Sequence, residues 1–185
     1  MSPEKRREMI VHAVLPLVVE HGAAVTTSQI ARAAGIGEAT VFRAFTDKEE
    51  LLTACIAEAF KSDRAVDAIA AIPLDQPLAD RLLEAASALA ARMERIGALV
   101  GALHASGYQR DSKRALRSGR RESSLAVRDA VADLFEPERE SLRLPPEQMA
   151  GIFTNVLMTR SRPLEGEDIP STADVVDVLL HGAVK

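Results

Sequence analysis

The chain has 185 residues, of which 47% are hydrophobic and 27% are charged. This composition is typical of a folded globular protein and excludes a wholly disordered chain. The single cysteine, Cys55, excludes an intramolecular disulfide and a multi-cysteine metal site, and the four histidines are too widely spaced to form a metal-binding pair. A formal net charge of −4 argues against nonspecific coating of nucleic acid but leaves room for a local DNA-reading face.

Helix-favouring residues dominate the chain, and aromatic residues make up only 3% of it, which disfavours a sheet-rich fold. The first predicted helix begins after Ser2, a capping residue, and ends at Gly22, with a kink expected at Pro16. Further helices are predicted for residues 27–34, 38–45, about 47–72 with a break near Ser62-Asp63, 78 to about 104, about 113–135, 147–161 and 171–183. Kinks are also expected at Gly97 and Gly101. No strand is predicted, and we expect an all-α fold.

The most informative stretch is Thr26 to Leu52, TTSQIARAAGIGEATVFRAFTDKEELL. Thr26 and Gln29 have the spacing of a capping box at the start of one short helix. Gly35 stands where a helix end needs a positive φ, and the apolar Ile36 fits the angle between two helices. Two short helices joined by a glycine turn make a helix-turn-helix.

Helical spacing separates the inward and outward faces of this motif. The positions predicted to point into the core are Ile30, Ala31, Ala34, Val41 and Phe45. The positions left facing outward on the second helix are Glu38, Ala39, Thr40, Phe42 and Arg43. A second capping box is predicted at Thr46-Asp47-Lys48-Glu49, where the next helix begins.

At these residues the chain resembles the TetR family of bacterial transcriptional regulators. The resemblance is carried by Thr27, Ile30-Ala31, Ala34-Gly35-Ile36, Thr40-Val41-Phe42, Phe45, Lys48-Glu49 and Leu51-Leu52, within about residues 4 to 56. It implies a homodimer whose recognition helices enter successive major grooves of a palindromic operator. It also implies that Thr27 contacts a phosphate, that Glu38, Ala39, Thr40 and Arg43 face the groove, and that Lys48 holds the DNA backbone.

Two departures from the family pattern bear on DNA binding. Phe42 stands where the family usually has a tyrosine whose hydroxyl contacts phosphate, and Gly37-Glu38 stand where a polar or basic residue is common. Residues 1–48 carry a net charge of only about +1, so binding is expected to be selective and salt-sensitive. The alternative is a helical ligand-binding or scaffold protein whose helix-turn-helix no longer reads DNA.

The remainder of the chain is interpreted as a body that binds an effector and dimerises. The predicted domains are a DNA-binding domain at residues 1–48 and an effector-binding and dimerisation domain at residues 49–185. Small and flexible residues on the inward stripes predict an apolar cavity between the helices at 78–104, 113–135 and 147–161. The candidate ligand-binding residues are Met93, His104, Tyr108, Thr154, Asn155 and Met158.

Broad apolar stripes on the last two helices predict the dimer interface. Such stripes are too wide for terminal helices unless a second copy covers them as a four-helix bundle. The candidate interface residues are Met149, Ile152, Phe153, Val156, Val175, Val176, Leu179 and Ala183.

Catalysis, cofactors and membranes receive little support from the sequence. No nucleophile has a base at a recognisable spacing, and no metal or cofactor motif is found. No apolar run is long enough to cross a membrane and no signal peptide is recognised, so the cytoplasm is the expected location. Cys55 is interpreted as a core residue rather than a redox sensor. The basic segment Arg110 to Arg121 is interpreted as a solvated face, with attraction of an anionic ligand as the alternative.

Overall fold

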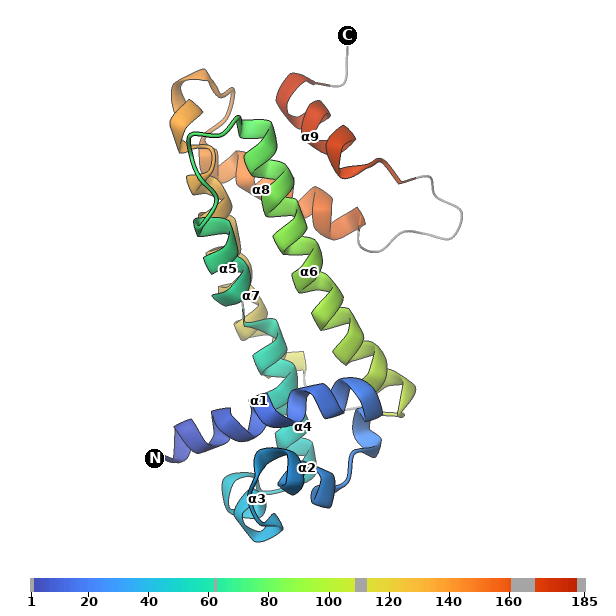
Figure 1. The fold of residues 1–185 in the computed structure, drawn as a ribbon. Coiled ribbons are helices and arrows are strands. Elements are labelled where there is room, and N and C mark those ends of the chain that lie inside the picture. The colour runs from blue at the N-terminus through green and yellow to red at the C-terminus, as the bar shows by residue number, and fades with distance from the viewer. Residues whose placement is uncertain (1, 62, 109–112, 161–168, 183–185) are drawn as a thin grey trace. The chain divides into compact units, whose positions relative to one another are not determined.

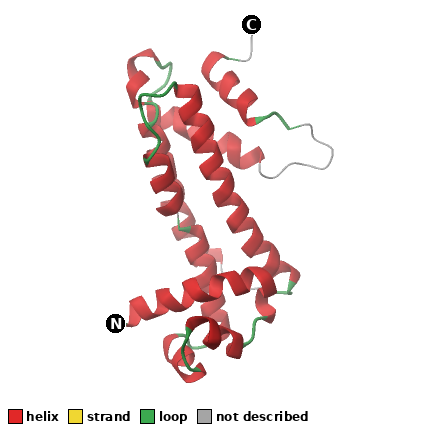
Figure 2. Ribbon diagram, viewed as in Figure 1, coloured by secondary structure: helices red, strands yellow, loops and turns green. Residues whose placement is uncertain are grey.

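The computed structural model describes residues 2–61, 63–108, 113–160 and 169–182, and of residues 113–120 the backbone alone. Every regular element in these ranges is helical (Figures 1 and 2). The α-helices are α1 (Pro3–His21), α2 (Thr27–Ala34), α3 (Glu38–Ala44), α4 (Lys48–Phe60), α5 (Asp63–Ala70), α6 (Leu78–Ala105), α7 (Lys113–Asp133), α8 (Pro146–Arg160) and α9 (Thr172–His181). Two 3₁₀ helices, η1 (Gly22–Ala24) and η2 (Glu136–Ser141), complete the order.

The chain divides into two compact units, and α6 contributes residues to both. Unit 1 contains the described residues of Met1–Lys61 and Glu94–Arg120. Its core joins α1 to α4 with the end of α6. Its fully or almost fully buried members include Ile10, Val14, Ile30, Val41, Phe45, Leu52, Leu99 and Leu103. Burying one such side chain contributes about 1.5–3 kcal/mol, so this core fixes the positions of the short helices α2 and α3.

Unit 2 contains the described residues of Ser62–Met93 and Arg121–Lys185. Its core draws on α5 to α9, through buried residues that include Ile69, Leu82, Val131, Phe135, Phe153 and Val176. Arg81 is fully buried in this unit, where Nη1 donates to the Leu134 carbonyl at 2.8 Å and Nη2 pairs with Glu138. A buried arginine of this kind needs such partners, because an unpaired charge in the interior is costly.

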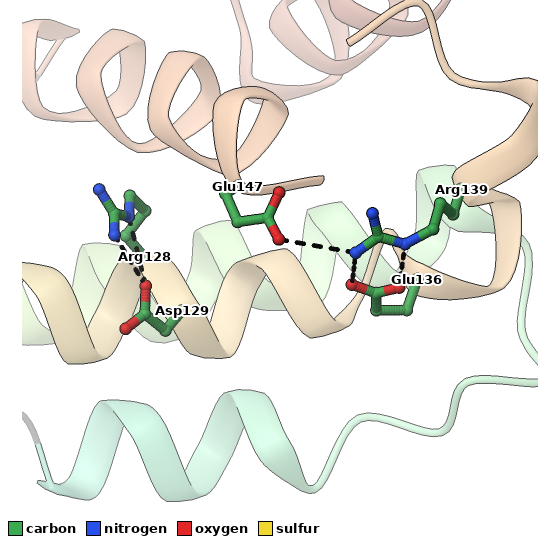
Figure 3. Close-up of polar contacts among 5 residues, drawn as sticks. All are labelled: Arg128, Asp129, Glu136, Arg139 and Glu147. Carbon is green, nitrogen blue, oxygen red and sulfur yellow. Dashed lines mark hydrogen bonds and ion pairs between the residues drawn. The ribbon is translucent and has the colours of Figure 1, made fainter. Parts of the chain in front are cut away.

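Exposed ion pairs lie on unit 2 between η2 and the start of α8 (Figure 3). Arg139 donates to both carboxylate oxygens of Glu136, at 2.7 and 2.5 Å, and lies 3.5 Å from Glu147 in the first turn of α8. The hydrogen bond from Arg139 lowers the pKa of Glu136. Exposed pairs such as these contribute little to stability, so the buried core holds the unit together.

The predicted all-α fold is confirmed, and most helix limits agree with the sequence pattern. The break expected within residues 47–72 is confirmed, because α4 ends at Phe60 and α5 begins at Asp63. The 3₁₀ helices were missed. Gly97, Val100 and Gly101 lie on the exposed side of α6 rather than on an inward stripe. α1 continues through Pro16, and the kink expected there remains a prediction.

Candidate DNA interface and ligand cavity

Local hydrogen bonds begin and end the first helix of the motif as the sequence predicts. Gln29 N donates to Thr26 Oγ1 at 3.2 Å, and Thr26 N donates to Gln29 Oε1 at 2.7 Å, which completes the capping box. Gly35 ends α2 with φ 66° and ψ 29°, a left-handed conformation that glycine adopts without a Cβ penalty. These two features set the angle at which the chain enters α3.

α3 is held against unit 1 by one face and leaves the other face free. Val41 and Phe45 are buried, and Ile36 in the turn is half-buried against the same core, as predicted. On the outer face, Phe42 is 53% exposed, and Glu38, Ala39 and Arg43 are also exposed. Thr40 on α3 and Thr27 at the start of α2 are half-buried. The predicted DNA-reading residues therefore share one end of unit 1.

The predicted second cap is shifted by one residue. Asp47, not Thr46, is the N-cap of α4, because its Oδ1 accepts a hydrogen bond from Glu50 N at 2.7 Å. Glu50 in turn accepts a hydrogen bond from Thr46 N at 2.6 Å. Lys48 is the first residue of α4, and its Nζ donates to the Ala23 carbonyl at 2.5 Å, which ties α4 to η1.

Arg7 forms a clamp that sequence reasoning missed. Its Nη2 lies 2.7 Å from Glu50 Oε1, its Nη1 donates to the Ala44 carbonyl, and its guanidinium stacks 4.2 Å from the centre of the Phe45 ring. The hydrogen bond from Thr46 N, followed by that from Arg7, lowers the pKa of Glu50 to about 2. The clamp joins α1, α3 and α4, so Arg7 has a structural role.

The end of α6 contacts η1 so closely that a side chain does not fit at Gly22. A Cβ at this position would lie 2.3 Å from the Ala102 carbonyl oxygen and 2.4 Å from Ser106 Oγ. Ala23 N donates to Ser106 Oγ at 2.7 Å, and the Ala23 carbonyl accepts from Lys48. Within unit 1 these contacts connect α6 to the motif through η1.

Unit 2 contains a cavity of about 130 Å³ between α6, α8 and the start of α9. Its lining residues are Ala86, Leu89, Ala90, Met93, Thr154, Leu157, Met158, Arg160 and Thr172. This volume is close to the ~150 Å³ of an apolar cavity that holds a benzene molecule. Among the described residues no three histidine, cysteine, aspartate or glutamate side chains cluster as metal ligands.

Comparison with known proteins agrees with the geometry of the motif. Residues 10–55, which run from α1 to α4, match the family model described as bacterial regulatory proteins, tetR family. Over these residues the chain is similar to TetR-family transcriptional regulators. None of the curated protein sequences compared with it matches.

Several solved structures share the fold along almost the whole chain. A regulator from Streptomyces coelicolor is 24% identical with a TM-score of 0.53, covering 98% of this chain and 79% of that one. A protein of Mesorhizobium loti assigned to the family is 19% identical with a TM-score of 0.69, covering 97% of both chains. Salmonella enterica GusR is 19% identical with a TM-score of 0.61, covering 98% and 96%. At these identities the likeness shows the fold alone.

The cavity of unit 2 includes only part of the predicted ligand set. Met93, Thr154 and Met158 line it, whereas Asn155 is exposed on α8 and does not. His104 is exposed at the end of α6, and Tyr108 packs in unit 1 with its hydroxyl 3.3 Å from Thr53 Oγ1. The sequence showed helical spacing but not which turns of α6 belong to each unit, so these two positions were misplaced. None of the described side chains of α7, at residues 121–133, lines the cavity.

Most of the residues predicted to form the dimer interface line an apolar groove on unit 2. The groove has a volume of about 540 Å³ and runs between α8, α9 and the loop after η2. Ile152, Val156, Val175 and Leu179 line it and retain solvent exposure. Met149 and Phe153 line the floor of the groove and are buried, whereas Val176 is buried in the core and does not line it. Ala183 lies outside the described residues.

The structure also describes the surroundings of Cys55 and the apolar character of the helices. Cys55 is fully buried in α4, and this burial raises the pKa of its thiol to about 12, which agrees with a core role. In the described part of the chain no helix is long and apolar enough to cross a membrane. Most of the basic segment Arg110 to Arg121 lies outside the side chains that the structure describes.

Proposed function

We propose that this chain is a repressor that binds a palindromic operator as a homodimer in the cytoplasm and is released by a small-molecule effector. Residues 1–48 read the DNA, and residues 49–185 bind the effector and dimerise. The observation that carries the proposal is the exposed outer face of α3, with Arg43 and Thr40 presented on a helix fixed by a buried core. A short helix held in this way is suited to the major groove.

The contacts in the DNA are assigned by position. Arg43 is exposed in the last turn of α3 and is free to donate two hydrogen bonds to a guanine edge. Glu38, Ala39, Thr40 and Phe42 face the groove beside it, and Thr27 contacts a phosphate from the start of α2. Lys48 holds the DNA backbone from the start of α4, where it exchanges the Ala23 carbonyl for a phosphate oxygen.

A second copy of the chain covers the groove of α8 and α9. Ile152 is 42% exposed and Val178 is 49% exposed, although both are large and apolar. Covering these side chains stabilises a dimer by removing apolar surface from water. A two-fold dimer also explains how a weakly basic reading head suffices, because two heads act on one palindrome.

Effector binding is transmitted along α6. The cavity is lined by Ala86 to Met93 of this helix, and its later residues belong to the core of unit 1. The end of α6 holds Ala23 through Ser106, and Ala23 in turn holds Lys48. An effector that favours one position of α6 therefore changes the separation of the two reading heads. Such coupling typically amounts to about 1–3 kcal/mol.

A second candidate is a ligand-binding protein whose motif does not read DNA. It is favoured by Phe42, which exposes a ring without a hydroxyl on the outer face of α3, and by Glu38, which exposes an acid there. A carboxylate is repelled by the DNA phosphates, and a hydrogen bond from the amino group of a cytosine would offset that repulsion.

A titration of the full chain against duplexes from its own upstream DNA distinguishes the two candidates. Fluorescence anisotropy should show a duplex that binds at least a hundredfold more tightly than a scrambled duplex of equal length. Arg43→Ala should weaken specific binding by about 1–3 kcal/mol. Arg64→Ala, at an exposed arginine of α5, is the matched control and should leave affinity unchanged. Equal affinity of the wild type for both duplexes would favour the second candidate.

A further inference from the structure

Arg160 places one cationic group in the wall of the otherwise uncharged cavity of unit 2. It lies in the last turn of α8 and is the only charged side chain among the described residues that line the cavity. Its Nη1 is buried and has no hydrogen-bond partner among the described residues. A buried guanidinium donor without a partner costs free energy. Because Arg160 lines the cavity, a rotation of its side chain towards an acceptor in the cavity would remove this cost.

The neighbouring polar groups do not satisfy Arg160. Asp174 of α9 is close enough for Arg160 to contribute to the lowering of its pKa, after the two hydrogen bonds with Ser171. Ser171 N already donates to Asp174 Oδ2 at 2.8 Å, and Nη1 remains unpaired beside it. Thr154 Oγ1 donates its proton to the Ala150 carbonyl at 2.8 Å, so this hydroxyl has no proton left for an anion.

Apart from Thr172 at the start of α9, the remaining lining is apolar and small in extent. Leu89, Met93, Leu157 and Met158 supply aliphatic and thioether surface around a volume of about 130 Å³. Methionine adapts to irregular shapes, and a volume of this size holds a group about as large as a benzene ring. The cavity therefore combines an apolar body with one cationic group, Arg160.

We propose that this cavity binds a small organic monoacid, with its carboxylate on Arg160 and its ring-sized apolar body between α6 and α8. This inference rests on the proposed function, because it names the chemical class of the effector. Arginine suits a carboxylate, since its planar fork forms charge-assisted hydrogen bonds with both oxygens. A neutral amide of the same shape keeps the apolar contacts but loses the charge.

Calorimetry on the full chain without DNA tests the ligand class with benzoate and benzamide, and with butanoate and butanamide. At least one acid should bind about tenfold or more tightly than its amide. Arg160→Gln should remove this preference, and Arg64→Gln, which changes an exposed arginine of α5, should retain it. Equal affinity of acid and amide for the wild type, or no binding by either pair, would overturn the inference.

A second pair of variants tests the location of the site. Ala90 is exposed and lines the cavity, whereas Ala91 is exposed and does not line it. Ala90→Phe should weaken acid and amide alike, and Ala91→Phe should weaken neither. Equal effects of the two variants would overturn the assigned position.

A DNA titration keeps this inference separate from the proposed function. If the chain binds no specific duplex in the absence of acid, the proposed function fails while the preference for acid over amide still stands. If the operator is bound and no acid in the calorimetric series binds, the ligand class fails and the regulator remains.

Discussion

Replacement of Gly22 by alanine tests the contact between η1 and the end of α6. Gly22 has φ 56° and ψ −137°, a conformation that L-residues rarely adopt. Holding alanine in such a region costs about 1–3 kcal/mol. The new Cβ would also lie 2.3 Å from the Ala102 carbonyl oxygen, which belongs to backbone and cannot rotate away. Overpacking of this kind adds about 1–3 kcal/mol, so a total loss of about 2–5 kcal/mol is expected.

Gly35→Ala is the matched control for the backbone term. Gly35 also has a positive φ, 66°, but a Cβ there would meet nothing within 4 Å. The left-handed conformation alone costs about 1–2 kcal/mol. Urea unfolding followed by circular dichroism should therefore show Gly22→Ala to be more destabilising than Gly35→Ala by at least about 1 kcal/mol. Equal losses would refute the steric contact with α6.

Three other variants test the clamp, the dimer and the recognition helix. Glu50→Gln should lower the free energy of unfolding by about 1–2 kcal/mol above pH 4.5. The lowered pKa of Glu50, about 2, corresponds to roughly 3 kcal/mol, and solvent screening of this partly exposed pair reduces that figure. The difference in stability from wild type should vanish as the pH falls towards 2 and Glu50 is protonated, and a difference that stays constant with pH would contradict the clamp. Leu179→Asp should give monomers by light scattering that lose operator binding, whereas a monomeric wild type at micromolar concentration would defeat the interface. Phe42→Tyr should tighten operator binding by about 0.5–1.5 kcal/mol through a new phosphate hydrogen bond, and unchanged or weaker affinity would mean a different docking of α3.

Local chemistry made the helix-turn-helix predictable from sequence. The Thr26 cap, the glycine turn at Gly35 and the apolar spacing of Val41 and Phe45 act over a few residues, and the structure confirms each of them. The second cap was wrong by one residue, since Thr46 and Asp47 are both good capping residues and tertiary contacts decide between them. Glu50 reaches back to Thr46 while pairing with Arg7, which favours Asp47 as the cap.

Long-range packing explains what the sequence did not reveal. Arg7 and Glu50 are separated by 43 positions, and Arg81 and Glu138 by 57, so no local pattern links either pair. Spacing along α6 likewise predicted one apolar stripe, whereas the residues of this helix up to Met93 belong to unit 2 and those from Glu94 onwards belong to unit 1. His104 was misplaced for this reason. The division of α8 and α9 residues between core and groove also depends on neighbours distant in sequence.

Selection of bound sequences from a random duplex library tests the central claim most directly. The full chain should enrich a palindrome whose half-sites lie about one helical turn apart. Titration of that duplex should give two chains per duplex and an affinity that falls steeply with salt. Enrichment of no sequence, together with equal affinity for random duplexes, would contradict the account of a DNA-reading regulator.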